Sequence, residues 1–398
     1  MSSIFPFAAL RPVPRSAAAV AAVPYDVVNT EEARALAAGN PLSFLHVSRP
    51  EIDLPTGTDP HSNSVYDRAV QNFATLKTQA PLVVEEVPSF YVYRLTMGGH
   101  VQSGVAACYS IDEYDRGLIK KHEKTRPDKE DDRTRHMLAI GAQTGPVFLT
   151  YRASRAVDAI VSRIVQQPAL FDFTAPDGVR HEVWQAAATE NQAIVDAFAK
   201  IDSLYIADGH HRAASAARTQ KQLASKGAGE HDRVLAVAFP DNQMQILPYN
   251  RVVTDLRGRT PAAFLDELRR AMTVRDGGPQ GPPPKGHVAM YVDGKWHTIA
   301  LPPGTHALDV DLLQSSILEP MLGIADVRTD KRIDFVGGIR GPGELERLVS
   351  SGKFAAAFSM HPVSVDDLMR VSDAGGIMPP KSTWFEPKLR DGLLSHLI

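Results

Sequence analysis

Cysteine is nearly absent from this chain of 398 residues, and the single one is Cys108. One thiol can form neither an intramolecular disulfide nor a cluster of thiolate metal ligands. Cys108 lies in the apolar run Val105–Tyr109, so we expect a small buried side chain within a strand. The sequence therefore excludes disulfide scaffolds and thiolate-metal proteins.

Surplus positive charge is also missing, because 43 Lys and Arg stand against 46 Asp and Glu, a formal net charge of −3. Proteins that bind nucleic acid or anionic membranes normally carry an excess of basic residues, so we expect neither partner. No run reaches the ~20 apolar residues of a membrane span. The Ala-rich segment 16–23 only superficially resembles a signal peptide, since prolines crowd it, and the expected location is the cytoplasm.

Several common catalytic motifs are absent. The chain has no Gly-x-x-x-x-Gly-Lys-Ser/Thr phosphate loop, no dinucleotide-binding glycine fingerprint, no protein-kinase signature and no Gly-x-Ser-x-Gly nucleophile elbow. A phosphotransferase with this sequence would therefore not be a standard one.

Helical and extended patterns alternate along the whole chain, which predicts an α+β fold of mixed sheets with flanking helices. The length favours more than one domain. We expect two packed subdomains, an N-terminal catalytic region over residues 1–256 and a C-terminal α+β region over residues 257–398. The clearest local signals are the capping box Asn29/Glu32, a helix over 64–77, a hairpin around Gly98-Gly99, and a hairpin around Asp293-Gly294.

The run Ala207–Arg212 lies between a predicted strand, 204–207, and a predicted helix, 213–223. Asp208 stands where a helix N-cap is expected, and Gly209 permits a sharp turn. The amides and dipole of the helix start favour an anion, to which His210, His211 and Arg212 add side-chain donors. The pattern predicts a site for a phosphorylated or otherwise anionic group.

A second interpretation of this run is a capped helix start whose histidines bond locally. Neighbouring side chains on a helix diverge by about 100°, so His210 and His211 are not expected to bind one metal ion together. One of them is expected to face the ligand while the other supports the fold.

Another polar concentration spans Lys120–Arg133, which we interpret as a structured loop broken by Gly117 and Pro127. A charge run of this kind is often only a solvated face. It also mixes phosphate-binding donors with carboxylates that can act as a base or hold magnesium. The donors are Lys121, His122, Lys129 and Arg133, and the carboxylates of interest are Glu123 and Glu130. Folded beside Asp208–Arg212, this segment would complete a site.

Three further segments are weaker candidates. Pro24-Tyr25-Asp26 offers a carboxylate on a rigid turn, and Tyr249-Asn250-Arg251 is a polar cluster that ends a predicted strand. The third is the hydroxyl-rich segment Lys381–Phe385.

Motifs along nearly the whole chain resemble the bacterial and archaeal domain-of-unknown-function 1015 family. They include Pro24-Tyr25-Asp26-Val27, Lys121-His122-Glu123-Lys124-Thr125, Gly145-Pro146-Val147, Ala207–Arg212 and Met378–Thr383. Within that family, Asp-Gly-His-His-Arg looks like the phosphate-binding motif of free-serine kinases related to the partition-protein/sulfiredoxin fold. The resemblance implies such an element around Asp208–Arg212, with those five residues handling phosphate.

The resulting hypothesis is phosphoryl transfer from diphosphate or ATP to a small hydroxylated metabolite, with L-serine as the specific expectation. Arg212, His211, Arg133 and Lys121 would hold the donor and Mg²⁺ would bridge its oxygens, with Asp208 or Glu130 as possible ligands. Asp208 or Glu123 would act as the base. Arg251 is one candidate to bind an amino-acid carboxylate.

Two other functions remain open. Water in place of the acceptor would make the protein a metal-dependent phosphohydrolase or phosphodiesterase. A non-catalytic nucleotide or nucleic-acid binding module is disfavoured by the net acidity. The sequence leaves the oligomeric state open.

Overall fold

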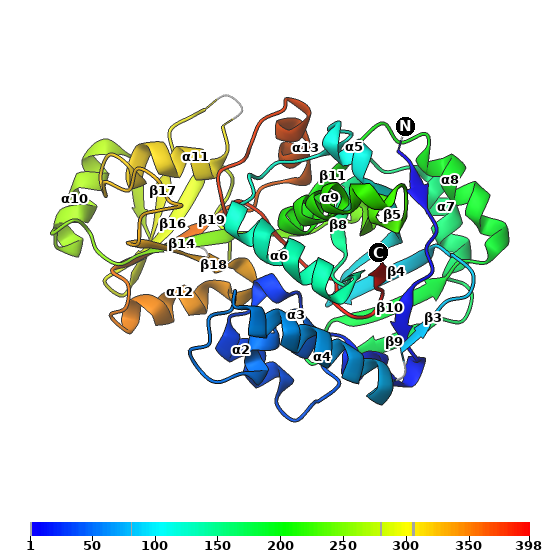
Figure 1. The fold of residues 1–398 in the computed structure, drawn as a ribbon. Coiled ribbons are helices and arrows are strands. Elements are labelled where there is room, and N and C mark those ends of the chain that lie inside the picture. Colours follow the sequence, from blue (N-terminus) through cyan, green and yellow to red (C-terminus); the bar gives the residue numbers. More distant parts are fainter. Residues whose placement is uncertain (1, 81, 279–280, 305–306) are drawn as a thin grey trace. The chain divides into compact units, whose positions relative to one another are not determined.

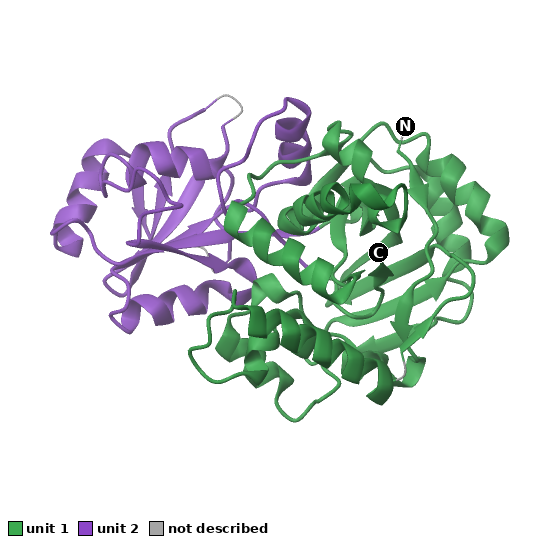
Figure 2. Cartoon of the chain, viewed as in Figure 1, with its two compact units in different colours: residues 1–244, 387–398 green, residues 245–386 purple. Residues whose placement is uncertain are grey.

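The computed structural model describes residues 2–80, 82–278, 281–304 and 307–398 (Figure 1). The chain divides into two compact units, Met1–Met244 with Pro387–Ile398, and Gln245–Glu386 (Figure 2). Sequence analysis predicted regions 1–256 and 257–398. The second unit includes residues 245–256 because β14 (Tyr249–Val253) pairs with β18 (Ile333–Gly337) and β19 (Ala356–Met360). The C-terminal segment belongs to the first unit.

The first unit is built on a mixed sheet with strand order β6-β11-β8-β12-β5-β4-β10-β9, and β1 pairs with β5. β11 runs parallel to β6 and β12 runs parallel to β8, whereas the remaining pairs are antiparallel. The strands are β1 (Ile4–Phe5), β4 (Tyr91–Met97), β5 (His100–Ser110), β6 (Ile119–Lys120), β8 (Val147–Tyr151), β9 (Phe171–Thr174), β10 (Arg180–Gln185), β11 (Leu204–Asp208) and β12 (Arg233–Pro240). Two short pairs, β2 (Leu10–Pro12) with β3 (Leu82–Val84) and β7 (Ala142–Gln143) with β21 (His396–Leu397), complete the strands of this unit.

The central strands of this sheet are buried on both faces. All five residues of β8 are buried, as are eight of the eleven in β5 and seven of the eight in β12. Strands covered on both faces are expected to be largely apolar, which holds for β8, for β12 and for the Val105–Tyr109 part of β5. Cys108 lies within β5 with no exposed surface, as predicted.

Helices cover the sheet and form a second layer (Figure 1). They are α1 (Ala17–Val20), α2 (Thr30–Ala37), α3 (Leu45–Ser48), α4 (Asn63–Gln79), α5 (Ile111–Asp115), α6 (Pro127–Ile140), α7 (Arg155–Ile164), α8 (Asn191–Phe198) and α9 (His210–Leu223). The predicted capping box is confirmed, because the Asn29 side chain accepts from the Glu32 amide and the Glu32 carboxylate accepts from the Asn29 amide. The helix over 64–77 and the hairpin around Gly98-Gly99 are confirmed as well.

The interpretation of Lys120–Arg133 as one loop was wrong. Only residues 121–126 connect β6 to the helix α6, which begins at Pro127. Proline fits the first helical position because the amide that it lacks has no helical partner there. Asp128 and Glu130 in the first turn and Gly141 at the C-terminal cap complete the helix signals.

The second unit is also α+β. Its sheet has the order β15-β17-β16-β19-β14-β18, and β13 pairs with β20. Its elements, beside those already given, are α10 (Pro261–Ala271), α11 (Asp309–Leu313), α12 (Gly341–Ser350), α13 (Val365–Asp373), β13 (Ile246–Leu247), β15 (Val274–Asp276), β16 (His287–Val292), β17 (Lys295–Ala300) and β20 (Trp384–Phe385). The hairpin at Asp293-Gly294 is confirmed, with positive φ at both residues as its tight turn requires.

Among the helices of the described ranges, none combines the length and the apolar character needed to cross a membrane.

Candidate functional site

The predicted motif lies at the junction of β11 and α9. β11 ends at Asp208, and Gly209 adopts a φ of +92° before the helix begins at His210. A Cβ at position 209 would stand 3.0 Å from Cζ and Nε of Arg212. Two features therefore require glycine at position 209: the positive φ, and the lack of space for a side chain beside Arg212.

The sequence pattern predicted Asp208 as the N-cap of α9. In the structure the N-cap is Gly209. The first helical bond runs from the Ala213 amide to the Gly209 carbonyl, 3.0 Å apart. The amides of His210, His211 and Arg212 precede it and have no carbonyl four residues back within the helix. The start of this 14-residue helix therefore offers backbone donors and the positive end of its dipole.

The Asp208 carboxylate is held between two cations. Its Oδ2 lies 3.2 Å from Nζ of Lys388 and 3.3 Å from a terminal nitrogen of Arg212. Burial opposes ionisation, but the Lys388 and Arg212 charges outweigh it and hold the pKa of Asp208 well below its usual range. The side chain is ionised at every physiological pH.

The Arg212 guanidinium connects this turn to Asp26, which follows β2 far earlier in the chain. One terminal nitrogen lies 3.4 Å from Asp26 Oδ2, and the other donates to the Pro146 carbonyl. The arginine side chain is 7% exposed, whereas that of Asp26 is 32% exposed. Asp26 thus presents a carboxylate to solvent next to a buried, fixed positive charge.

Arg212 also lines a cavity of about 40 Å³, room for a few water molecules, whose walls carry both polar and apolar side chains. Its lining includes Arg212, Arg133, Tyr25 and Asp391. In the part of the chain that the structure describes, Arg212 Nε and Asp391 Oδ1 are buried without a hydrogen-bond partner. Burial and the Asp26 charge raise the pKa of Asp391 to about 7, although Arg212 and Arg133 act against them.

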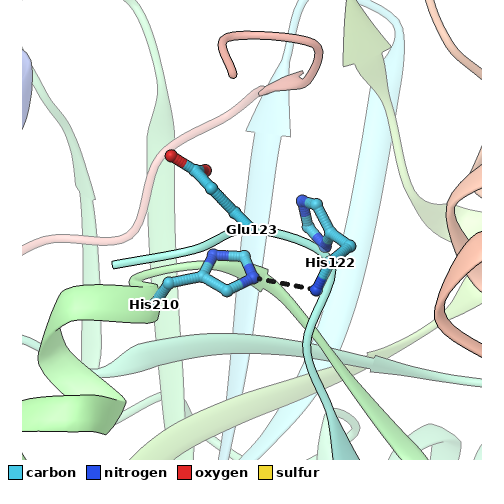
Figure 3. Close-up of side chains that lie close together, drawn as sticks. All are labelled: His122, Glu123 and His210. Atoms are coloured by element: carbon cyan, nitrogen blue, oxygen red, sulfur yellow. Dashed lines mark hydrogen bonds between the residues drawn. The ribbon is translucent and has the colours of Figure 1, made fainter. Parts of the chain in front are cut away.

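The segment 121–126 contacts the start of α9 at two points. The His122 amide donates to His210 Nε2 over 3.4 Å, and the Arg126 amide donates to His211 Nε2 over 3.1 Å. The rings of His122 and His210 meet edge to face with centroids 4.4 Å apart (Figure 3). Burial lowers the pKa of His122 to about 4 and holds the pKa of His210 well below its usual value, so both imidazoles are neutral at pH 7.

Potential metal ligands also meet here. Within the described ranges, one ligand atom each of His122, Glu123 and His210 lies within 4.8 Å of the others. Figure 3 shows the three side chains close together, with the His122 amide directed at the His210 ring.

The other site residues predicted in the Lys120–Arg133 run make the following contacts. Lys121 places its ammonium 3.7 Å from the centre of the Tyr114 ring, and Lys129 is exposed on α6. Glu130 forms an ion pair with Arg218, 3.2 Å long, and accepts from the Thr125 hydroxyl. Arg133 lines the cavity and forms an ion pair with Asp132.

Arg251 lies in the second unit. Its buried guanidinium donates to the Tyr249 carbonyl and stacks on Phe335, 5.5 Å from the ring centre. The cluster Tyr249-Asn250-Arg251 begins β14 and does not end a strand, as had been expected, and Arg251 is the middle residue of β14.

Sequence reasoning gave Asp26 little weight and missed Lys388 and Asp391. Asp26 carried a signal, since it follows Pro24-Tyr25 on a rigid turn. Lys388 carried none, because it lies 180 residues from Asp208 and no local pattern marks it.

The fold and site define an α+β protein whose helix start offers backbone donors beside ion-paired carboxylates. The chain belongs to the family described as protein of unknown function (DUF1015), whose model matches residues 4–317. The resemblance to this family is thereby confirmed.

Matches to solved structures were found at low similarity. A free serine kinase in complex with AMP has 13% identity and a TM-score of 0.38, covering 72% of this chain and 92% of that chain. A conserved hypothetical protein from Pyrococcus furiosus has 15% identity and a TM-score of 0.37, covering 73% and 95%. SbnI from Staphylococcus aureus has 12% identity and a TM-score of 0.37, covering 72% and 85%. No curated protein matches the sequence.

Proposed function

We propose that the protein is a small-metabolite kinase that transfers a phosphoryl group from ATP or diphosphate to a hydroxyl, with L-serine as the best specific acceptor. The observation that carries the proposal is the Gly209 turn, where the amides of a helix start lie beside Arg212 and Lys388. Such a start binds phosphate through donors and dipole together. The likeness of Asp208–Arg212 to the phosphate-binding motif of free-serine kinases supports the same function, and the cytoplasm is the proposed location.

The backbone amides at the start of α9 and the Lys388 ammonium would bind the phosphoryl donor. The Lys388 ammonium lies 3.2 Å from the Asp208 carboxylate, so it is already positioned beside the Gly209 turn. From there it can also donate a hydrogen bond to a phosphate oxygen. Arg212 is buried and bonded to Pro146 and two carboxylates. Its role is to position Asp208 and Asp26 rather than to reach the donor.

Asp26 is the carboxylate best placed to receive the acceptor's proton. Asp208 is neutralised by two cations and its low pKa makes it a weak base, whereas Asp26 contacts one cation and is partly exposed. In the reaction the hydroxyl oxygen attacks the terminal phosphorus of the donor. The new P–O bond forms as the bridging P–O bond breaks, ADP or phosphate leaves, and the hydroxyl proton passes to Asp26.

Magnesium does not fit the two protein ligands expected for it. Asp208 is bonded to Lys388 and Arg212, and Glu130 is paired with Arg218. A cation brought by the donor would be held mainly through phosphate oxygens, as Mg²⁺ commonly is.

The test is incubation of the purified protein with Mg²⁺, ATP or diphosphate, and a panel of amino acids and polyols that includes L-serine. Phosphorylated product is followed by ³¹P NMR and mass spectrometry. We expect Asp26→Asn to lower kcat by ~10²- to 10⁴-fold, the scale of general-base catalysis. Asp172→Asn is the matched control, because Asp172 pairs with Arg180 on a surface hairpin and its loss should leave the rate unchanged.

Two outcomes would overturn the proposal. No phosphorylated acceptor with either donor would exclude the kinase, and donor hydrolysis alone would identify a phosphohydrolase. Salt-dependent retention on DNA without turnover would favour a binding module.

A further inference from the structure

We propose that His122, Glu123 and His210 form a binding site for a divalent first-row transition-metal ion. The site goes beyond phosphoryl transfer, since metal binding at these residues needs neither donor nor acceptor. It is carried by the convergence of two imidazoles and one carboxylate, with ligand atoms within 4.8 Å of one another.

The sheet brings these residues together. β6 and β11 are parallel neighbours, with Leu204 opposite Ile119 and Tyr205 opposite Lys120. Parallel strands end at the same edge of a sheet, so the residues that follow β6 and β11 leave side by side. His122 and Glu123 follow β6 after one intervening residue, Lys121, and His210 begins α9 after the Gly209 turn. The cluster is therefore a consequence of topology and not of a flexible surface.

The two histidines are held by buried surroundings. His122 is 2% exposed and His210 is 6% exposed, and their rings contact each other. A ring nitrogen of His122 bonds to the Ile206 carbonyl, so in the neutral ring that nitrogen carries the proton and the other bears a lone pair. Metal-ligating histidines typically donate their second nitrogen to a backbone carbonyl in this way.

His210 would lose little hydrogen bonding on binding a metal ion. Its Nε2 accepts from the His122 amide over 3.4 Å, at the long limit for a hydrogen bond. A metal ion that takes a nitrogen of this ring replaces at most one weak bond.

The ligand set selects the class of ion. Imidazole suits Zn²⁺, Fe²⁺ and other first-row transition metals, whereas Mg²⁺ prefers oxygen ligands. Two histidines and one carboxylate leave coordination positions open for water or a bound anion. His210 is the first residue of α9, which places the ion beside the helix start.

The experiment measures metal binding without any substrate. Protein treated with a chelator and desalted is titrated with Co²⁺ and with Zn²⁺, by visible absorption of the Co²⁺ complex and by equilibrium dialysis with elemental analysis. We expect one equivalent bound by the wild type. Equal concentrations of Mg²⁺ should displace neither ion.

Three variants and one control locate the ion. Glu123→Gln changes a half-buried side chain and preserves its shape, and should weaken Co²⁺ binding at least ~10-fold, since even outer-shell changes cost about that much. His122→Ala and His210→Ala should abolish the stoichiometric binding, with thermal unfolding as the check that each variant is folded. His100→Ala, in the β4–β5 hairpin, should bind as the wild type does.

Failure of this inference is distinguishable from failure of the kinase. The metal site is overturned if the wild type binds no Co²⁺ or Zn²⁺, if Glu123→Gln binds as tightly as the wild type, or if Mg²⁺ displaces Co²⁺ at equal concentration. None of these outcomes depends on phosphorylated product.

Discussion

At the residue scale, Gly209 combines a backbone demand with a packing demand. Its φ of +92° disfavours any side chain by roughly 1–2 kcal/mol, and an added Cβ would press on the Arg212 guanidinium at 3.0 Å. We expect Gly209→Ala to lower the free energy of unfolding by more than that backbone cost, measured by urea denaturation, and to displace Arg212 from Asp26.

Gly141 is the matched control for this change. It caps α6 with a φ of +64°, and a Cβ there would meet nothing within 4 Å. Gly141→Ala should therefore show only the backbone cost. Equal destabilisation of the two variants would mean that the Arg212 contact contributes nothing.

Asp391 predicts a pH dependence of stability. Its pKa is raised by burial from the ordinary 3.8 to about 7 in the folded protein. Between pH 4 and pH 7 the carboxyl of Asp391 keeps its proton in the folded state and loses it in the unfolded state. The contribution of Asp391 to the free energy of unfolding is therefore fully present below about pH 4 and is lost as pH rises to about 7. The slope reaches about 1.4 kcal/mol per pH unit for one group.

Asp391→Asn removes the titration and keeps the shape of the side chain. The difference in unfolding free energy between wild type and variant should therefore fall as pH rises from 4 to 7, followed by denaturant titrations at each pH. Parallel curves for the two proteins would contradict the raised pKa.

At the scale of elements, two histidine rings tie the segment 121–126 to the start of α9. His211 accepts from the Arg126 amide over 3.1 Å. We expect His211→Ala to raise hydrogen exchange at residues 123–126 several-fold, because the amide loses its acceptor. His211→Gln, whose side-chain oxygen can accept the same bond, should restore much of the protection. If the alanine variant exchanges as slowly as the wild type, the bond does not order this segment.

Sequence patterns predicted elements where the signal is local. The Asn29/Glu32 capping box and the Asp293-Gly294 turn depend on a few adjacent residues, and both are present in the structure. Pro127 was misinterpreted because proline both stops helices and starts them. Which of the two applies depends on the residues that follow it.

The site was predictable only where its residues are adjacent. Asp208–Arg212 stands in one run, so its helix-start chemistry could be derived from the sequence. Pairing of β6 with β11, which brings His122 to His210, is a long-range contact that no local pattern contains. The ion pair of Lys388 with Asp208 is of the same kind.

At the scale of the whole molecule, the chain leaves the first unit, builds the second and then returns. The segment Pro387–Ile398 pairs β21 with β7 and exchanges two backbone bonds between Ser395 and Leu10, each 2.9 Å. It also supplies Lys388 and Asp391 to the site. The first unit is therefore incomplete until the last residues of the chain are in place.

Removal of residues 387–398 should consequently unfold the first unit and spare the second. Leu389, Leu393 and Leu394 are each at most 2% exposed, and at roughly 1.5–3 kcal/mol per buried side chain their loss is comparable to the whole stability of a typical domain. Hydrogen exchange with mass spectrometry should show protection lost across 2–244 but kept in the β14–β19 region of 245–386. Leu393→Ala in the full chain, expected to cost about 2–5 kcal/mol, should leave the first unit folded but less stable. If the truncated chain kept full protection from hydrogen exchange in β5 and β12, the first unit would fold without residues 387–398 and this prediction would be wrong.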